Sequence, residues 1–126
     1  MIFLIQYPLL LSLMKNRKIF LYGYIVLILL LSSIPDESVP SVVGLTWDKS
    51  LHFIEYGILG VLLRRTQKGS NIFGAINLCL FGIVIGCLDE LWQTLIPGRV
   101  GSYFDVMADA LGVIFGVSTT NYFLKK

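Results

Sequence analysis

The segment "IFGAINLCLFGIVIGCL", residues 72–88, decides the fold class that we expect for this chain. It contains no charged residue. A helix that crosses a lipid bilayer needs about 20 predominantly apolar residues, with a range of about 17–25. The segment lies at the short end of that range, and the nearby Trp92 can anchor its end at the membrane interface. We therefore predict a transmembrane helix here.

Three further apolar runs lie at residues 19–34, 46–63 and 103–124. Of the 126 residues, 56% are hydrophobic and 14% are charged, whereas a typical soluble domain has about 25% charged residues. The mean hydropathy is +0.78. These values predict an all-α membrane protein, in which residues 19–126 form a single domain, a bundle of four transmembrane helices.

Residues 1–18 form an apolar and basic lead segment before this domain. Its first part, "MIFLIQYPLLLSLM" (1–14), is too short to span a bilayer and is interrupted by Pro8. A signal peptide carries its basic residues before the apolar core, but here they come after it. We expect either an interfacial segment or residues upstream of the real start.

The basic residues predict the orientation of the bundle. Eight of the ten Lys and Arg residues lie in "KNRK" (15–18), "RRTQK" (64–68) and the terminal "KK" (125–126). Four spans would bring all three stretches to one side, and the positive-inside rule makes that side cytoplasmic. Both termini are then cytoplasmic, and Lys49 and Arg99 lie outside. The outer side would also hold Trp47 and Trp92, which would form an aromatic belt there.

The acidic residues show an independent regularity, since they were not used to set the orientation. All eight map to outer loops or to the outer halves of the spans, and so does the single histidine, His52. At 100° per residue, the acids of each later span fall on one face of their helix, together with glycines in "GIVIG" (82–86) and "GVIFG" (112–116). Such small-residue spacing lets transmembrane helices pack closely. The polar residues should therefore point into the bundle and line a polar pocket at its extracytoplasmic end.

The charges of this pocket do not balance, because eight acids face only Lys49 and Arg99. The excess carboxylates can keep their protons, hold a cation, or stay solvated at the rim, as we expect for Asp36 and Glu37. A divalent cation is therefore one candidate cofactor. Basic residues are few and serve topology, which argues against nucleic acid as a partner. The lipid bilayer is the partner that the composition predicts.

The stretches "DKSLHFIEYGILG" (48–60) and "DELWQTLIPGRVGSYFDVMADALG" (89–112) resemble the VanZ-like membrane proteins. The matching residues are Asp48, Lys49, His52, Phe53, Tyr56, Glu90, Gln93, Arg99, Ser102, Asp105 and Gly112. Asp109 stands where the family usually has Asn. The resemblance covers residues 48–116 and implies a small multi-pass protein of the bacterial plasma membrane. It also implies a link to teicoplanin resistance, but it supplies no biochemical mechanism.

Two sets of roles are open for the pocket residues. In an enzyme, His52 and Glu90 would act as acid and base, Asp48 would orient His52, Arg99 would hold an anionic group, and Asp105 would orient or bind a cation. Further candidates for substrate binding are Gln93, Ser102, Lys49, Tyr56 and Asp109. The structural alternatives are a His52 hydrogen bond between helices, a Glu90–Arg99 ion pair, and helix-to-helix bonds of the two aspartates, with Ser102 capping the last span.

The leading functional hypothesis is a pocket that binds or modifies a lipid-linked component of the cell envelope. A second hypothesis is a non-enzymatic protein that shields an antibiotic target. A third is an accessory or structural membrane protein that binds a partner protein through its glycine stripes.

Overall fold

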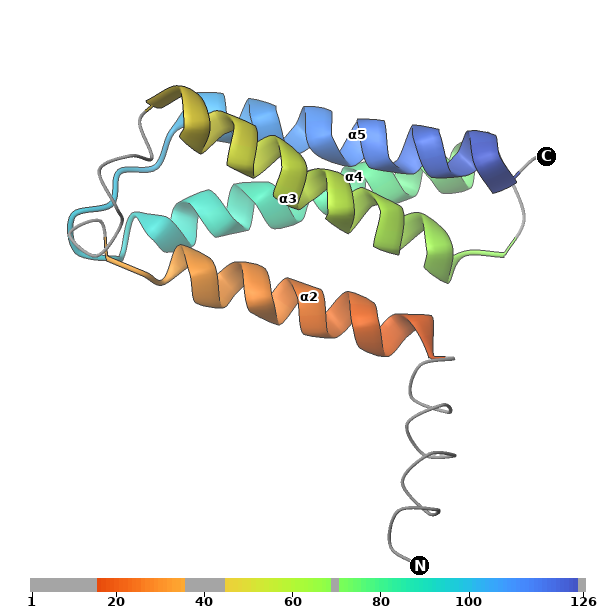
Figure 1. The fold of residues 1–126 in the computed structure, drawn as a ribbon, viewed down its shortest axis with the longest axis horizontal. Coiled ribbons are helices and arrows are strands. Elements are labelled where there is room, and N and C mark those ends of the chain that lie inside the picture. The colour runs from red at the N-terminus through yellow and green to blue at the C-terminus, as the bar shows by residue number, and fades with distance from the viewer. Residues whose placement is uncertain (1–15, 36–44, 69–70, 125–126) are drawn as a thin grey trace, which may run out of the picture.

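The computed structural model describes residues 16–35, 45–68 and 71–124. Within these ranges it contains four helices and no strand: α2 (Arg17–Ser32), α3 (Leu45–Thr66), α4 (Ile72–Gln93) and α5 (Tyr103–Leu124). Successive helices run in opposite directions (Figure 1). The predicted all-α architecture is confirmed. The predicted lead run at 1–14, the rim residues Asp36 and Glu37, the side chain of Trp47 and the terminal lysines lie outside the described residues.

Local sequence explains where the helices begin and end. The side chains of Asn16 and Asn71 cap α2 and α4, because each accepts a hydrogen bond from the backbone N–H two residues later. The α4 helix continues to Gln93, five residues beyond the predicted run. Its acidic end is therefore helical. The chain then reverses through Gly98, whose φ of 79° favours glycine.

The closest helix pair is α3 with α5, and glycine allows the approach. A Cβ atom on Gly112 would overlap the carbonyl oxygen of Phe53, and one on Gly116 would overlap that of Gly57. The "GVIFG" stripe thus packs on the backbone of α3, as its spacing predicts. Gly82 and Gly86 of the other stripe instead face side chains of α5, at Val113 and Asp109. Helix α2 contacts α3 and α4 but not α5.

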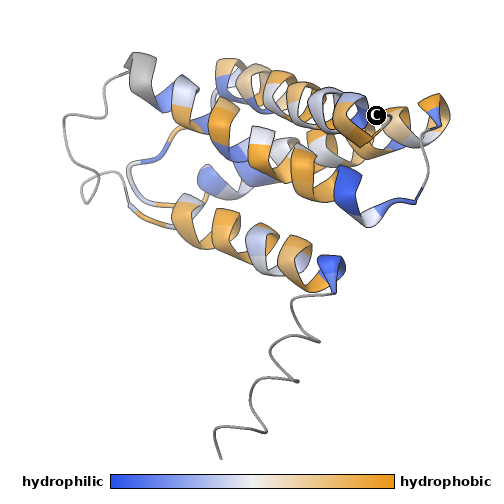
Figure 2. Ribbon diagram, turned by 45° about the vertical axis from the view of Figure 1, so that its right-hand side comes forward, coloured by the Kyte–Doolittle hydropathy of each residue, from blue (hydrophilic) through white to orange (hydrophobic). Residues whose placement is uncertain are grey.

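Polar and apolar residues are distributed in the reverse of a soluble protein. The buried residues of the described ranges include eight polar or charged ones, whereas large apolar side chains are exposed on all four helices. In Figure 2, hydrophobic residues cover most of each helix, and hydrophilic residues gather mainly near the helix ends. Water would strongly disfavour an exposed apolar surface of this extent, which suits contact with lipid.

By length and hydropathy, α4 is the one described helix that is long and apolar enough to cross a membrane, with a mean hydropathy of 2.1. The α2 helix has 16 residues, a rise of about 24 Å, which is shorter than a hydrocarbon core of about 30 Å. Charged residues near both ends of α3 lower its hydropathy. The α4 helix thus indicates a membrane protein, while the four-span arrangement is a proposal developed below.

Candidate functional site

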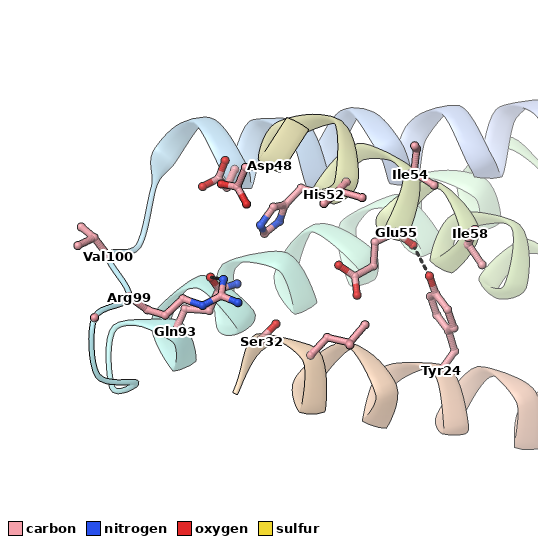
Figure 3. Close-up of a pocket in the computed structure, with 14 residues that line it drawn as sticks. Tyr24, Ser32, Asp48, His52, Ile54, Glu55, Ile58, Gln93, Arg99 and Val100 are labelled. Carbon is pink, nitrogen blue, oxygen red and sulfur yellow. Dashed lines mark hydrogen bonds between the residues drawn. The ribbon is translucent and has the colours of Figure 1, made fainter. Parts of the chain in front are cut away.

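A cavity of about 630 Å³ lies between α2, α3 and the segment after α4. One part of its wall is apolar, with Leu31, Leu51, Ile54, Ile58 and Val100. The polar part is formed by Ser32, Asp48, His52, Glu55, Gln93, Arg99 and Asp105, with Tyr24 and Gly98 completing the lining. Figure 3 shows Arg99 reaching in from the segment after α4, while His52 and Glu55 point toward it from α3. The cavity therefore combines a charged end with an apolar side.

His52 of α3 is held by Asp109 of α5. Its Nδ1 lies 2.9 Å from Oδ1 of Asp109, and both side chains are buried. We expected Asp48 to orient this histidine, but the carboxylate that meets it comes from α5. Asp48 lines the cavity instead and lies near His52 and Asp105. A carboxylate on one ring nitrogen fixes the orientation of the imidazole.

Glu90 of α4 ties the segment after α4 to the helix end. Its Oε2 accepts a hydrogen bond of 2.8 Å from the backbone N–H of Ser102, and its Oε1 lies 3.9 Å from Nδ1 of His52. Among the described residues there is no Glu90–Arg99 ion pair, which was one sequence-based alternative. The carbonyl oxygen of Ser102 accepts from the backbone N–H groups of Asp105 and Val106 near the start of α5, so its backbone joins Glu90 to that helix.

Arg99 instead contacts neutral oxygen atoms. Its Nε donates to the carbonyl oxygen of Ile34 at 3.0 Å, and its Nη1 donates to Oε1 of Gln93, also at 3.0 Å. The first bond joins this segment to the end of α2. Trp92 supports the same junction, since its Nε1 donates to the hydroxyl of Ser33. Arg99 therefore closes one end of the cavity, and no carboxylate of the described part of the chain pairs with it.

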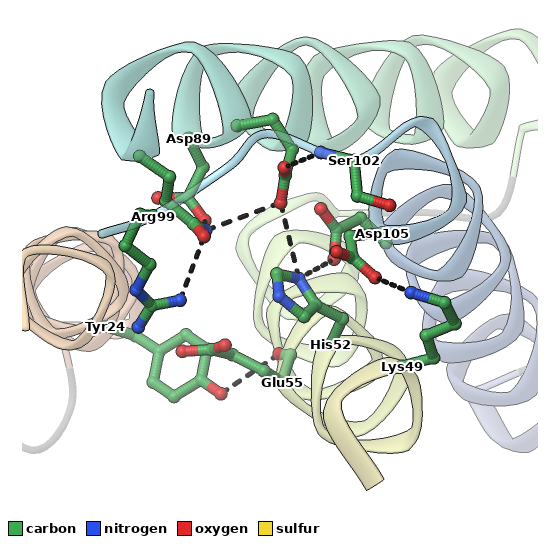
Figure 4. Close-up of polar contacts among 11 residues, drawn as sticks. Tyr24, Lys49, His52, Glu55, Asp89, Arg99, Ser102 and Asp105 are labelled. Carbon is green, nitrogen blue, oxygen red and sulfur yellow. Dashed lines mark hydrogen bonds and ion pairs between the residues drawn. The ribbon is translucent and has the colours of Figure 1, made fainter. Parts of the chain in front are cut away.

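A second charged contact crosses from α3 to α5. Nζ of Lys49 lies 2.6 Å from Oδ1 of Asp105, and the same ammonium group lies 5.9 Å from the centre of the Phe104 ring. The Lys49–Asp105 and His52–Asp109 pairs are the two helix-to-helix bonds that one sequence-based alternative predicted for Asp105 and Asp109. Figure 4 shows how the polar contacts from α3, α4 and α5 converge around His52.

Some buried polar atoms have no hydrogen-bond partner. These atoms are Oε1 of Glu55, Oη of Tyr56, Oδ1 of Asp89 and Oδ2 of Asp109. Tyr56 and Asp89 are almost inaccessible to solvent. Glu55 and Asp89 were not among the predicted binding residues, although both lie on the polar faces that helical periodicity indicated. Two sets of side chains offer ligand atoms close enough together to hold a metal ion: Asp48, His52 and Asp105, or His52, Glu90 and Asp109.

The family model VanZ/LLP1 matches residues 12–124 of the chain. This chain belongs to the VanZ/LLP1 family. The match includes all the residues on which the resemblance rested, from Asp48 to Gly112. No curated protein and no solved structure shows significant similarity to this chain.

Most of the residues shared with the VanZ pattern meet at one end of this VanZ/LLP1 protein. His52, Gln93, Arg99 and Asp105 line the cavity, and Glu90 lies behind it. Two other positions serve packing. The ring of Phe53 lies 5.7 Å from that of Phe115, and Gly112 allows α5 to approach α3. Tyr56 lies deeper, in the buried core.

Proposed function

We propose that this VanZ/LLP1 protein is a four-span protein of the bacterial plasma membrane whose cavity binds the polar head of a lipid-linked envelope component. In this arrangement both termini are cytoplasmic and the cavity faces the extracytoplasmic side. The family and the apolar α4 support a membrane location. The exposed apolar side chains on the other helices favour spans there too.

The observation that carries the ligand class is the mixed wall of the cavity. Asp48, Glu55 and Gln93 offer acceptors for the hydroxyl or amino groups of a sugar or peptide head. Arg99 can form paired hydrogen bonds with a phosphate oxygen pair. Beside them, Ile54 and Ile58 of α3 and Leu31 of α2 provide an apolar surface for the adjoining lipid chain. A polar head that carries phosphate and hydrogen-bond donors and is attached to a lipid chain would fit the acceptors, Arg99 and the apolar surface together.

The His52–Asp109 pair favours a second possibility at the same site, in which the bound component is modified. A buried carboxylate that orients an imidazole is a common arrangement for proton transfer. If the protein modifies its ligand, His52 would act as acid or base, Asp109 would orient it, and Glu90 would assist. In that case His52→Asn should retain more unreacted lipid than the native protein. If the protein only binds its ligand, His52→Asn should not accumulate unreacted lipid.

The proposal is tested by native mass spectrometry of the protein purified in mild detergent. We expect a co-purified lipid with a polar, phosphate-containing head, and its loss in Arg99→Gln. The matched control is Lys68→Gln, because Lys68 is an exposed basic residue near the end of α3 remote from the cavity. Retention of the same lipid by Arg99→Gln, or a native protein that carries only bulk membrane lipid, would contradict the proposal.

The family resemblance extends this proposal to glycopeptide antibiotics. A protein that sequesters or modifies a lipid-linked wall component would change the target that teicoplanin meets at the membrane surface. Expression of the native chain should then lower teicoplanin susceptibility, and Arg99→Gln should abolish that effect at equal protein level. If the two proteins give the same susceptibility, binding at Arg99 has no part in resistance.

A further inference from the structure

Three helices each contribute one buried side chain to a single point beside the cavity. The side chains are His52 of α3, Glu90 of α4 and Asp109 of α5, and one nitrogen or oxygen atom from each lies within 4.8 Å of the other two. Nδ1 of His52 is 2.9 Å from Oδ1 of Asp109 and 3.9 Å from Oε1 of Glu90. All three residues are at most 6% exposed. The ligand atoms of one metal ion have similar spacing, because they lie about 2.0–2.3 Å from a common centre.

The charge at this point is unbalanced. Glu90 and Asp109 are two carboxylates, and among the described residues His52 is the one basic side chain within 4.0 Å of either. The neighbouring bases are committed to other groups, since Lys49 pairs with Asp105 and Arg99 bonds Gln93 and Ile34. With a neutral imidazole, the three side chains carry a net charge of minus two. Buried charge of this kind is costly unless it is paired, and a divalent cation would neutralise it.

A separate observation indicates an additional ligand at the same place. Oδ2 of Asp109 has no hydrogen-bond partner, although this side chain is 0% exposed. Buried polar atoms are nearly always satisfied by protein, water or an ion. The free oxygen of Asp109 can complete a bidentate contact with a cation or bind a water molecule that the cation holds.

We propose that His52, Glu90 and Asp109 hold one divalent cation between α3, α4 and α5. Two carboxylates and one imidazole suit Mn²⁺ or Zn²⁺ better than Mg²⁺, which prefers oxygen ligands alone. The N–H of Ser102 donates to Oε2 of Glu90 and would hold this carboxylate in its orientation. The cation would join three helices at one end of the bundle. Its binding does not depend on whether the cavity takes a lipid.

The test is a titration of chelator-stripped protein with MnCl₂ in detergent, in which electron paramagnetic resonance measures free Mn²⁺. We expect one saturable site per chain, with a nitrogen coupling from the imidazole in the bound spectrum. Glu90→Gln and Asp109→Asn should each weaken binding by about 10-fold or more, because even the loss of a group that only supports a metal ligand commonly costs that much. Asn77→Ala is the control, since Asn77 is exposed on α4, outside both the set and the cavity, and this change should leave the affinity unchanged.

Asp48→Asn separates this site from the alternative set of Asp48, His52 and Asp105 at the cavity wall. If Asp48→Asn weakens Mn²⁺ binding and Asp109→Asn does not, the cation lies at the wall and the proposal is wrong. The proposal is also wrong if the folded native protein shows no saturable binding, or if bound Mn²⁺ lacks nitrogen coupling. These two results need no variant, so they decide the question even if a substitution prevents folding.

Discussion

His52 and Asp109 are 57 residues apart in the chain and meet between α3 and α5, with Nδ1 2.9 Å from Oδ1. The contact depends on Gly112 and Gly116, which follow Asp109 along α5 and allow the two helix backbones to come together. The same close approach lets Lys49 reach Asp105 one turn nearer the helix ends. The polar cluster and the tight helix packing are thus parts of one interface.

The first prediction concerns the strength of this pair. Asp109→Ala removes the partner of a buried imidazole, and we expect it to lower the free energy of unfolding by about 0.5–2 kcal/mol. In the cation-free protein Asp109→Asn should cost less, because its amide oxygen can still accept from Nδ1–H. Thermal unfolding in detergent, followed by circular dichroism, measures both. If the Ala variant is as stable as the native protein, the pair makes no net contribution to stability.

The second prediction concerns helix packing. Gly116→Ala should destabilise the protein by about 1–3 kcal/mol, because the added Cβ meets the backbone of α3 at Gly57, which cannot move aside independently. Alanine otherwise favours a helix over glycine by about 1 kcal/mol. Gly23→Ala provides the control, since a Cβ at Gly23 meets nothing within 4 Å. The same unfolding measurement should show Gly23→Ala to be neutral or slightly stabilising, and equal effects at both sites would exclude close packing at Gly116.

Helical periodicity predicted which faces are buried but not which residues meet. The polar stripes of α3 and α5 follow from 3.6 residues per turn. His52, Asp105 and Asp109 are buried as the stripes predict, whereas Asp48 and Glu55 are only partly buried. Sequence reasoning named Asp48, on the same helix, as the partner of His52, whereas the structure provides Asp109. Which residue of α5 faces His52 depends on the register of α5 against α3, which the backbone contacts of Gly112 and Gly116 set. No local pattern encodes that register.

The bonds of Arg99 were missed for a related reason. One of the two sequence-based alternatives gave Arg99 a carboxylate partner, Glu90, because Arg99 is one of two bases at an acidic end. In the structure it bonds the carbonyl oxygen of Ile34, 65 residues away. That oxygen is available because it follows the last turn of α2, where carbonyl groups lack helical partners. A backbone acceptor has no signature in the sequence, so composition alone could not identify it.

The third prediction follows from these bonds. Arg99→Lys keeps the charge but loses the planar group that donates to Ile34 and Gln93 together. We expect the backbone amides of residues 96–102 to exchange hydrogen about 3–10-fold faster, as the loss of one or two hydrogen bonds implies. Hydrogen exchange with mass spectrometry measures this change. Arg65→Lys is the control, because the side chain of Arg65 is exposed and its described hydrogen bond uses the carbonyl oxygen.

The last prediction tests the membrane arrangement. In a background of Cys79→Ala and Cys87→Ala, a single cysteine is introduced at Val100, which is 86% exposed beside the cavity, or at Lys68 near the opposite end of the bundle. The positive-inside rule puts Lys68 in the cytoplasm. A membrane-impermeant maleimide should therefore label Val100→Cys on intact cells, and should label Lys68→Cys only after permeabilisation.

Each other labelling pattern has a definite meaning, because α4 separates the two positions in the chain. The reverse pattern would turn the cavity toward the cytoplasm and rule out a ligand on the outer surface. Labelling of both cysteines on intact cells would mean that α4, the most apolar of the described helices, does not cross the membrane. The expected pattern would establish one crossing and put Arg99, His52 and the cavity on the side where envelope intermediates are exposed.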